Sequence, residues 1–226
     1  MAGAAFFDLD RTLISRSSSL SLAPAFHRRG LVRRRDRMKA EVAQLFFVRY
    51  GAGKSRVGQT AESAMAFLKG LPVETMREII DEAVDSALKP YVYREALVLV
   101  ERHREHGERS FIVSAALQEI VDALVAELGL DGGLGSVAEV ENGVYTGRLV
   151  RRLDGHAKAE AIGALASEEG IDLAESTAYS DSASDVPFLE AVGDPVAVNP
   201  DRTLRGIAAE RNWRVLRFSD MAFRDG

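Results

Sequence analysis

The sequence predicts an α/β protein: a parallel sheet core with helices on both faces, an inserted all-helical segment and a β-hairpin. Three observations support this prediction. Short apolar runs that stop at polar residues alternate with amphipathic helical patterns. A stretch of about 75 residues after the first run has helical periodicity and no strand pattern. An Asn-Gly pair also lies between two runs of β-forming residues.

Five short apolar runs are expected to form the strands of the parallel sheet. Each is bounded by polar or turn residues, which is typical of strands that are buried on both faces. In chain order they are Ala4–Phe7, Ser110–Val113, Ser176–Tyr179, Pro195–Val198 and Trp213–Leu216.

Amphipathic patterns between these runs predict the helices that cover the sheet. The patterns cover Arg94–His106, Ala116–Leu128 and His156–Glu169, and each is followed by a glycine suited to end a helix. Within Val137–Val150, the pair Asn142-Gly143 predicts a hairpin turn, because both turn positions require positive φ.

The stretch without strands divides the chain into two expected domains. Residues 15–89 should form the helical cap, and residues 1–14 and 90–226 should form the core. Helical patterns in the cap are separated by glycine-containing segments and cover Leu20–Arg29, Val32–Tyr50, Val57–Lys69 and Glu74–Leu88.

The composition excludes several classes of protein. With 46% apolar residues and no cysteine in 226 residues, the chain is neither disordered nor a disulfide or thiolate-zinc scaffold. The net charge of −5 argues against a nucleic-acid partner. No apolar run has the roughly 18 residues of a membrane span, and the N-terminus reaches Asp8 too soon for a signal peptide. A cytoplasmic protein without an integral membrane segment is expected; its oligomeric state is left open.

Polar residues suited to phosphate and metal chemistry follow the predicted strands. In an open parallel sheet, ligands bind beyond the carboxyl ends of the strands. Taken singly, each residue is most simply a turn or helix-capping residue, or a solvated side chain. Together they place acidic, hydroxyl and lysine side chains on one sheet edge: Asp8, Asp10, Thr12, Ser114, Lys158, Asp181 and Asp185.

This order of residues resembles the haloacid dehalogenase (HAD) superfamily. Asp8-x-Asp10-x-Thr12, Ser114, Lys158 and Asp181-x-x-x-Asp185 match its four motifs, and the resemblance covers the whole chain. The helical insertion after the first motif resembles the phosphoserine-phosphatase-like branch. The resemblance implies a mobile helical cap on a Rossmann-like core.

The resemblance implies phosphoryl-transfer chemistry at two aspartates. Asp8 would attack phosphorus and form an aspartyl-phosphate. Asp10 would protonate the departing alcohol and then deprotonate the attacking water. The dehalogenases of the family lack this second aspartate, so its presence favours a phosphatase.

Crowded carboxylates at this edge predict a divalent cation, because a hard metal ion with oxygen ligands removes their mutual repulsion. Octahedral oxygen coordination indicates Mg²⁺. By resemblance, the ligands are the Asp8 carboxylate, the Asp10 backbone carbonyl and Asp181. Asp185 would bind through water or orient Lys158.

The remaining motif residues are assigned to the phosphate. Ser114 and the neighbouring Ala115 would contact phosphate oxygens, and Lys158 would neutralise their charge. Thr12 is placed in the same group, with its main contribution in fixing the loop after the nucleophile.

The expected function is a Mg²⁺-dependent phosphomonoesterase that acts on a small phosphorylated metabolite. Phosphoserine is a doubtful substrate, because phosphoserine phosphatases have a glutamate where this chain has Ser17. A phosphotransferase or mutase would share every core residue. A phospho-accepting signalling domain is a third alternative, although such domains are about half this length and lack a cap.

Two other patterns in residues 15–89 carry less weight. Gly51-Ala52-Gly53-Lys54-Ser55 resembles part of a P-loop but lacks its first glycine and a preceding strand. The basic run between Arg28 and Arg37 is interpreted as a solvated helix face. The alternative is that this run attracts an anionic substrate or a membrane surface.

Overall fold

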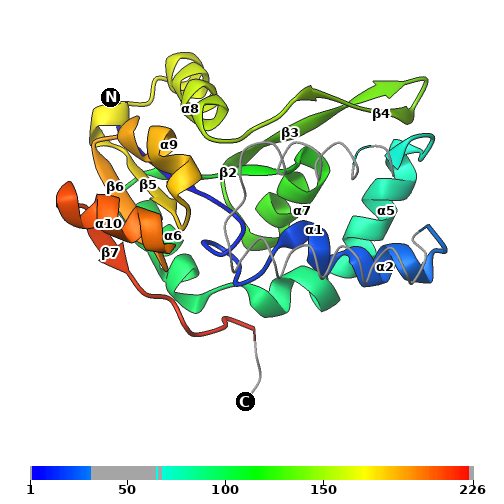
Figure 1. Cartoon of the computed structure of the whole chain (residues 1–226), viewed down its shortest axis with the longest axis horizontal. Helices are drawn as coiled ribbons and strands as arrows, with labels where there is room; N and C mark the ends of the chain where they lie inside the picture. The colour runs from blue at the N-terminus through cyan, green and yellow to red at the C-terminus, as the bar shows by residue number, and fades with distance from the viewer. Residues whose placement is uncertain (1, 32–64, 66–67, 224–226) are drawn as a thin grey trace.

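The computed structural model describes residues 2–31, 65 and 68–223, and a seven-stranded sheet lies at its centre (Figure 1). The strand order is β4-β3-β2-β1-β5-β6-β7, and every neighbouring pair is parallel except β3 and β4. The strands are β1 (Ala4–Phe7), β2 (Arg109–Leu117), β3 (Gly132–Glu141), β4 (Val144–Arg151), β5 (Thr177–Ser180), β6 (Asp194–Val198) and β7 (Arg214–Leu216). The predicted parallel α/β sheet is confirmed.

Helices cover both faces of this sheet, as predicted. Successive residues of a strand point to opposite faces, so Phe7 joins a hydrophobic cluster with α6 and α7, whereas Phe6 joins a second cluster with α8, α9 and α10. The helices are α6 (Arg94–Glu105), α7 (Gln118–Leu128), α8 (His156–Glu169), α9 (Val186–Glu190) and α10 (Arg202–Glu210). Short 3₁₀ turns cover Lys89–Tyr91, Leu173–Glu175 and Ala183–Asp185.

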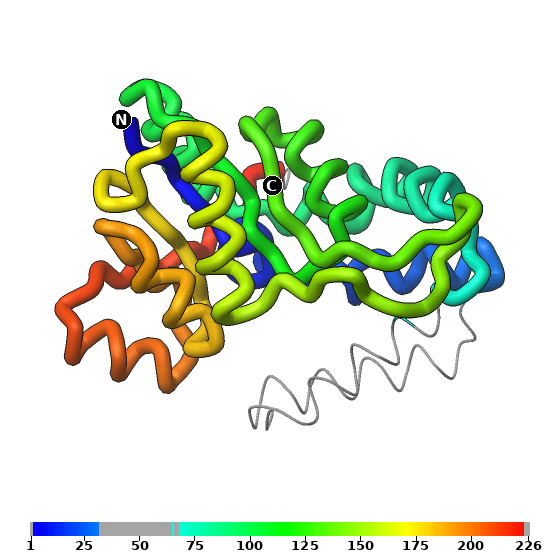
Figure 2. The backbone as a smooth tube through the Cα atoms, turned by 90° about the horizontal axis from the view of Figure 1, so that it is seen from above, coloured from blue at the N-terminus to red at the C-terminus, as the bar shows by residue number. Residues whose placement is uncertain are grey.

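The predicted hairpin is present, and it is also part of the main sheet. Asn142 and Gly143 form the turn with φ of 50° and 79°. The first strand, β3, begins at Gly132, earlier than the sequence predicted, and pairs in parallel with β2. Figures 1 and 2 show the hairpin extending from the sheet towards α5 (Val73–Ala83). Backbone hydrogen bonds join the hairpin to the first residue of α5, from Val73 N to Gly143 O (3.0 Å), and to the turn before this helix, from Gly70 N to Tyr145 O (2.8 Å).

The segment expected to form the cap is helical where the structure describes it. It contains α1 (Ser18–Ser21), α2 (Ala23–Arg28), α5 and a π-helical turn (Val84–Leu88). The predicted helices Val32–Tyr50 and most of Val57–Lys69 lie outside the described residues. At the base of this segment its two connections to the core run side by side.

Hydrogen bonds hold these two connections together. Ser15 N donates to Tyr91 O at 2.8 Å, and Tyr93 N donates to Leu13 O at 3.0 Å. The chain therefore leaves the core and returns to it at one place, as an insertion requires.

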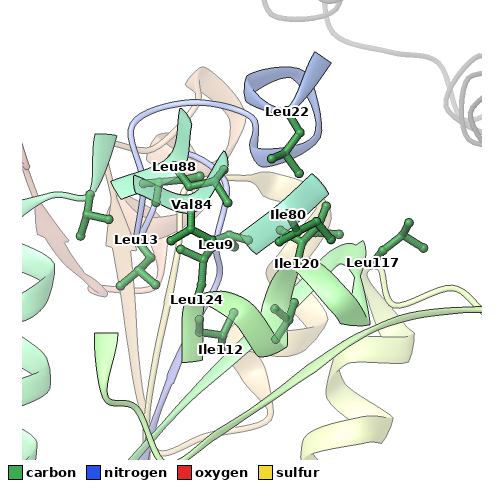
Figure 3. Packing of buried hydrophobic residues seen from close by; sticks show 14 of the residues in the cluster. Leu9, Leu13, Leu22, Ile80, Val84, Leu88, Ile112, Leu117, Ile120 and Leu124 are labelled. Carbon is green, nitrogen blue, oxygen red and sulfur yellow. The ribbon is translucent and has the colours of Figure 1, made fainter. Parts of the chain in front are cut away.

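Helix α5 packs on α7, which itself covers the sheet (Figure 3). Ile80 of α5 lies next to Ile120 of α7 in this view, and both belong to the cluster that contains Ile112 of β2. Leu9 and Leu13, from the loop after β1, belong to the same cluster. One hydrophobic core therefore extends from the sheet through α7 to α5.

We expect Ile80→Ala to lower the free energy of unfolding by about 2–5 kcal/mol, because the substitution leaves a cavity in this shared core. Ile80 is 1% exposed. Urea denaturation followed by circular dichroism would measure the change. Val98→Ala, at a side chain that is 54% exposed, is the matched control and should change stability by less than about 0.5 kcal/mol. An Ile80→Ala protein as stable as the control would show that α5 does not pack on the core.

Candidate active site

The carboxyl ends of β1, β2 and β5 bring the predicted residues together. Asp8 directly follows β1, and a hydrogen bond from its N–H to Tyr179 O (2.9 Å) extends the pairing with β5. Asp181 directly follows β5. Ser114 lies on β2, two residues beyond Ile112, which is the register partner of Phe7. The three motifs therefore meet at the edge where the sequence placed them.

Lys158 connects two of these motifs. It is the third residue of α8 and is 2% exposed. Its Nζ donates to Asp8 Oδ1 at 2.5 Å and to Asp185 Oδ2 at 2.6 Å. Burial disfavours the charged amine, but the two carboxylates outweigh burial and raise the pKa of Lys158 above its ordinary value. The ammonium group therefore remains charged at neutral pH.

Asp185 is held from two sides. Ser180 Oγ donates to Asp185 Oδ2 at 2.8 Å, the same oxygen that accepts from Lys158. Asp185 is 4% exposed and precedes α9. These contacts hold Asp185 beside the Lys158 ammonium group, which Asp8 also contacts.

Asp8 is 7% exposed, and its carboxylate lies close to other acidic groups. Burial raises the pKa of Asp8 above its ordinary value; Lys158 opposes this shift, and Asp185 and Asp10 add to it. The charged form of Asp8 therefore requires cations around it. Lys158 occupies Oδ1, which leaves Oδ2 for another partner.

The Asp10 carboxylate lies at the start of α1. Its Oδ1 accepts a hydrogen bond from Ser18 N at 2.9 Å. Burial raises the pKa of Asp10, and hydrogen bonds from Ser18 and Ser17 partly offset the shift. A carboxyl group in this environment retains its proton at higher pH than an exposed aspartate does.

Asp181 is paired with Arg11, whose guanidinium Nη2 lies 3.0 Å from Asp181 Oδ2. The backbone of Asp181 is fixed by a hydrogen bond from Asp201 N to its carbonyl oxygen (2.8 Å). Burial and the charge of Asp8 raise the pKa of Asp181 to about 8, and Arg11 opposes the shift. The charged form of Asp181, like that of Asp8, therefore requires a cation beside it.

The residues assigned to the phosphate differ in accessibility. Ser114 is buried, and its Oγ accepts a hydrogen bond from Ala116 N at 3.1 Å. Ala115 is exposed at the sheet edge. Thr12 is fully buried, and its hydroxyl has no hydrogen-bond partner within the described part of the chain. Its position suits a role in shaping the loop.

The predicted metal ligands are not equivalent in the structure. No three acidic or histidine side chains among the described residues form a ready-made metal cage. Asp10 turns its carboxylate to Ser18, and that of Asp185 is engaged by Lys158. Asp185 Oδ2 accepts from both Lys158 and Ser180, whereas Asp8 and Asp181 each contact a single cation through one oxygen. The second oxygens of Asp8 and Asp181 are therefore the ones that could hold a metal ion.

Three site residues were not predicted: Arg11, Ser180 and Asp201. Asp201 caps α10 by accepting from Leu204 N (2.7 Å) and also accepts from Ala183 N (3.0 Å), which fixes the loop after β5. Its helix-capping position was a usable signal, but α10 itself was missed. Ser180 directly follows the predicted strand Ser176–Tyr179. The sequence held no signal for the contact of Arg11.

Of the two patterns noted in residues 15–89, the structure describes only part of the basic run. The P-loop-like residues 51–55 and the arginines at positions 33–37 of the basic run lie outside the described residues. Arg29 forms ion pairs with Glu78 and Glu82 of α5, so this arginine serves contacts within the helical segment. No helix in residues 2–31, 65 and 68–223 is long and apolar enough to cross a membrane.

A lysine-bridged acidic site at the carboxyl edge of a parallel sheet defines a Rossmann-like α/β enzyme. The chain belongs to the haloacid dehalogenase-like hydrolases, because residues 5–190 match that family. The predicted family is confirmed.

Relatives and a solved structure support this assignment. The chain is 40% identical to an "Inhibition of morphological differentiation protein" of Streptomyces azureus, over 95% of this chain and 78% of that protein. It is 36% identical to a phosphoserine phosphatase of Mycobacterium tuberculosis, over 96% of this chain and 71% of that protein. A crystal structure of a Bordetella pertussis protein of unknown function superposes with a TM-score of 0.83 and 26% identity, covering 96% of this chain and 98% of the other. The predicted phosphoserine-phosphatase-like branch and the enzyme class, a HAD-type phosphatase, are likewise confirmed.

Proposed function

We propose that the protein is a Mg²⁺-dependent phosphomonoesterase that acts through an aspartyl-phosphate on Asp8. The observation that carries this proposal is the buried contact from Lys158 Nζ to Asp8 and Asp185 at the carboxyl edge of the sheet. A carboxylate held beside a fixed ammonium group is an anionic nucleophile that can approach an anionic phosphate.

The proposed reaction has two steps. An oxygen of Asp8 attacks phosphorus, the ester bond to the alcohol breaks, and the alcohol oxygen takes a proton from Asp10. Water then attacks the aspartyl-phosphate, Asp10 accepts a proton from that water, and inorganic phosphate leaves Asp8. The raised pKa of Asp10 suits the first step, because the group must hold a proton at neutral pH before it donates one.

Ser114, Ala115 and Lys158 are proposed to bind the phosphate. The Ser114 hydroxyl can donate to a phosphate oxygen, because its recorded contact with Ala116 N uses the oxygen only as an acceptor. Ala115 is exposed beside it, so the phosphate can reach its backbone. Lys158 adds a point charge, and the buried Thr12 helps to fix the loop after the nucleophile.

The site fits a magnesium ion on the basis of its donor set. Asp8 and Asp181 are buried carboxylates with pKa values raised by burial and by neighbouring carboxylates, and hard oxygen donors are the ligands that Mg²⁺ prefers. They would hold the ion with the Asp10 backbone carbonyl, and Asp185 would contribute by orienting Lys158 or through water. When bound, the ion would screen the phosphate from the anionic nucleophile.

We propose that residues 15–89 form the cap and select the substrate. The two hydrogen-bonded connections at Leu13–Ser15 and Tyr91–Tyr93 mark its base. The substrate class is a small phosphate monoester. Phosphoserine is one candidate through the M. tuberculosis relative, but Ser17 provides no charge for a substrate amine.

A phosphate-release assay tests this proposal. The protein with Mg²⁺ should release phosphate from p-nitrophenyl phosphate and from members of a metabolite panel that includes phosphoserine. EDTA should stop the reaction, and added Mg²⁺ should restore it. Adding alternative alcohols and identifying the phosphorylated products would separate hydrolysis from phosphotransfer. Absence of phosphate release from every ester would contradict the proposal.

We expect Asp10→Asn to lower kcat by about 10²–10⁴-fold in this assay, because an amide cannot transfer the proton. Asp85→Asn, at a side chain that is 81% exposed, is the matched control and should leave kcat unchanged. An Asp10→Asn protein with unchanged kcat would exclude Asp10 as the general acid and base.

A further inference from the structure

Arg11 occupies an unusual position in the loop after β1. Its φ is +64°, in the left-handed region that favours glycine or asparagine. A non-glycine residue costs about 1 kcal/mol or more in this conformation. The two following residues, Thr12 and Leu13, are fully buried, whereas the Arg11 side chain is 38% exposed. The backbone turn therefore directs a long cation outward over the site.

The guanidinium group crosses from the loop after β1 to the loop after β5. Its Nη2 lies 3.0 Å from Asp181 Oδ2. The two partners differ in freedom: the Asp181 side chain is 5% exposed and its backbone is held by Asp201 N, whereas Arg11 borders solvent. Arg11 can therefore leave the contact while the Asp181 carboxylate remains in place.

The ion pair between Arg11 and Asp181 balances part of the negative charge of the site. Asp8, Asp10, Asp181 and Asp185 are opposed by Lys158 and Arg11. Lys158 is already committed to Asp8 and Asp185. Arg11 is thus the cation that faces Asp181, one of the two carboxylates available to a metal ion.

We propose that Arg11 is an internal counter-ion that competes with Mg²⁺ for Asp181. The guanidinium stabilises the carboxylate in the metal-free protein and gives way to the metal ion when it binds. Arg11 is in this sense a positioning residue that sets metal affinity. The proposal rests on the proposed Mg²⁺ site.

Metal titration of the full chain tests this role. Mg²⁺ affinity would be measured by isothermal titration calorimetry at constant ionic strength for the wild type, Arg11→Gln and Arg11→Lys. Glutamine, like arginine, has a Cβ atom, so it leaves the backbone restriction at position 11 unchanged and removes the charge. Arg16→Gln is the matched control, since Arg16 is an exposed arginine of the same loop that stacks on Tyr91, 4.0 Å from the ring centre.

We expect Arg11→Gln to bind Mg²⁺ about three- to tenfold more tightly than the wild type, because the metal no longer displaces a partly exposed ion pair. Arg11→Lys should lie between the two, and Arg16→Gln should match the wild type. In EDTA, Arg11→Gln should melt at a lower temperature than the wild type. Saturating Mg²⁺ should reduce this difference.

The outcomes separate this proposal from the proposed function. Equal or weaker Mg²⁺ binding by Arg11→Gln, with saturable binding by the wild type, would overturn the role of Arg11 and leave the metal site intact. An equal increase in Mg²⁺ affinity in Arg11→Gln and Arg16→Gln would also overturn it, since the change in net charge would then explain the effect. Absence of saturable binding in every variant would overturn the metal site and this proposal together.

Discussion

Asp8→Asn is expected to lower kcat for p-nitrophenyl phosphate with Mg²⁺ by at least about 10⁴-fold, because the amide cannot form the covalent aspartyl-phosphate. The protein should remain folded. A neutral side chain of the same shape is tolerated there, because burial already disfavours the charged form of Asp8 and Lys158 keeps Asp185 as a carboxylate partner. Circular dichroism and thermal melting would establish that the fold is retained.

Two further measurements make this result specific to a nucleophile. Mass spectrometry of the rapidly quenched wild type should detect a phosphorylated form, and Asp8→Asn should not produce it. Asp194→Asn is the matched control, because Asp194 begins β6 at the opposite edge of the sheet, where it pairs with Arg214. Retained activity in Asp8→Asn would exclude the aspartyl-phosphate mechanism.

The strands and helices around the site could be predicted because their signals are local. Helix α8 begins and ends where its pattern indicated, and Gly170, with φ of 66°, ends it as expected. The start of β3 was missed because Gly132-Gly133-Leu134-Gly135 has no strand propensity.

The glycines of β3 are explained by packing. A Cβ atom at Gly133 would lie 2.3 Å from a methyl carbon of Val121, and one at Gly135 would lie 2.7 Å from the Cα of Gln118. Helix α7 therefore lies too close to β3 for side chains at these positions. This requirement depends on tertiary contacts, so it cannot be inferred from a local pattern.

The site shows the same division between local and tertiary information. The strand-end aspartates and Lys158 could be found from their order along the chain, because parallel strands align their carboxyl ends. The contact of Arg11 with Asp181 joins residues from two loops and depends on the left-handed backbone at Arg11. The role of Asp201 likewise requires the loop after β5 to be seen in place.

Lys158 is the residue whose loss should disturb both stability and activity. It lies between two carboxylates, with side chains of all three residues at most 10% exposed. Removing one partner of a buried ion pair typically costs 3–5 kcal/mol, because the remaining charge is left without compensation. Here two carboxylates would face each other without the ammonium group.

We expect Lys158→Met to lower kcat/KM by about 10²–10³-fold or more, since the phosphate and the nucleophile both lose their cation. It should also lower the free energy of unfolding by about 3–5 kcal/mol. Lys69→Met, at an exposed lysine, is the matched control and should change neither quantity.

A second substitution separates the structural effect of Lys158 from its catalytic effect. Adding Asp185→Asn to Lys158→Met removes one of the two opposed charges, so the double variant should recover part of the lost stability. Its kcat/KM should remain low, because no cation is restored beside Asp8. Recovery of activity together with stability would show that Lys158 only holds the fold. Recovery of stability alone would show that its charge acts on the phosphate and on Asp8.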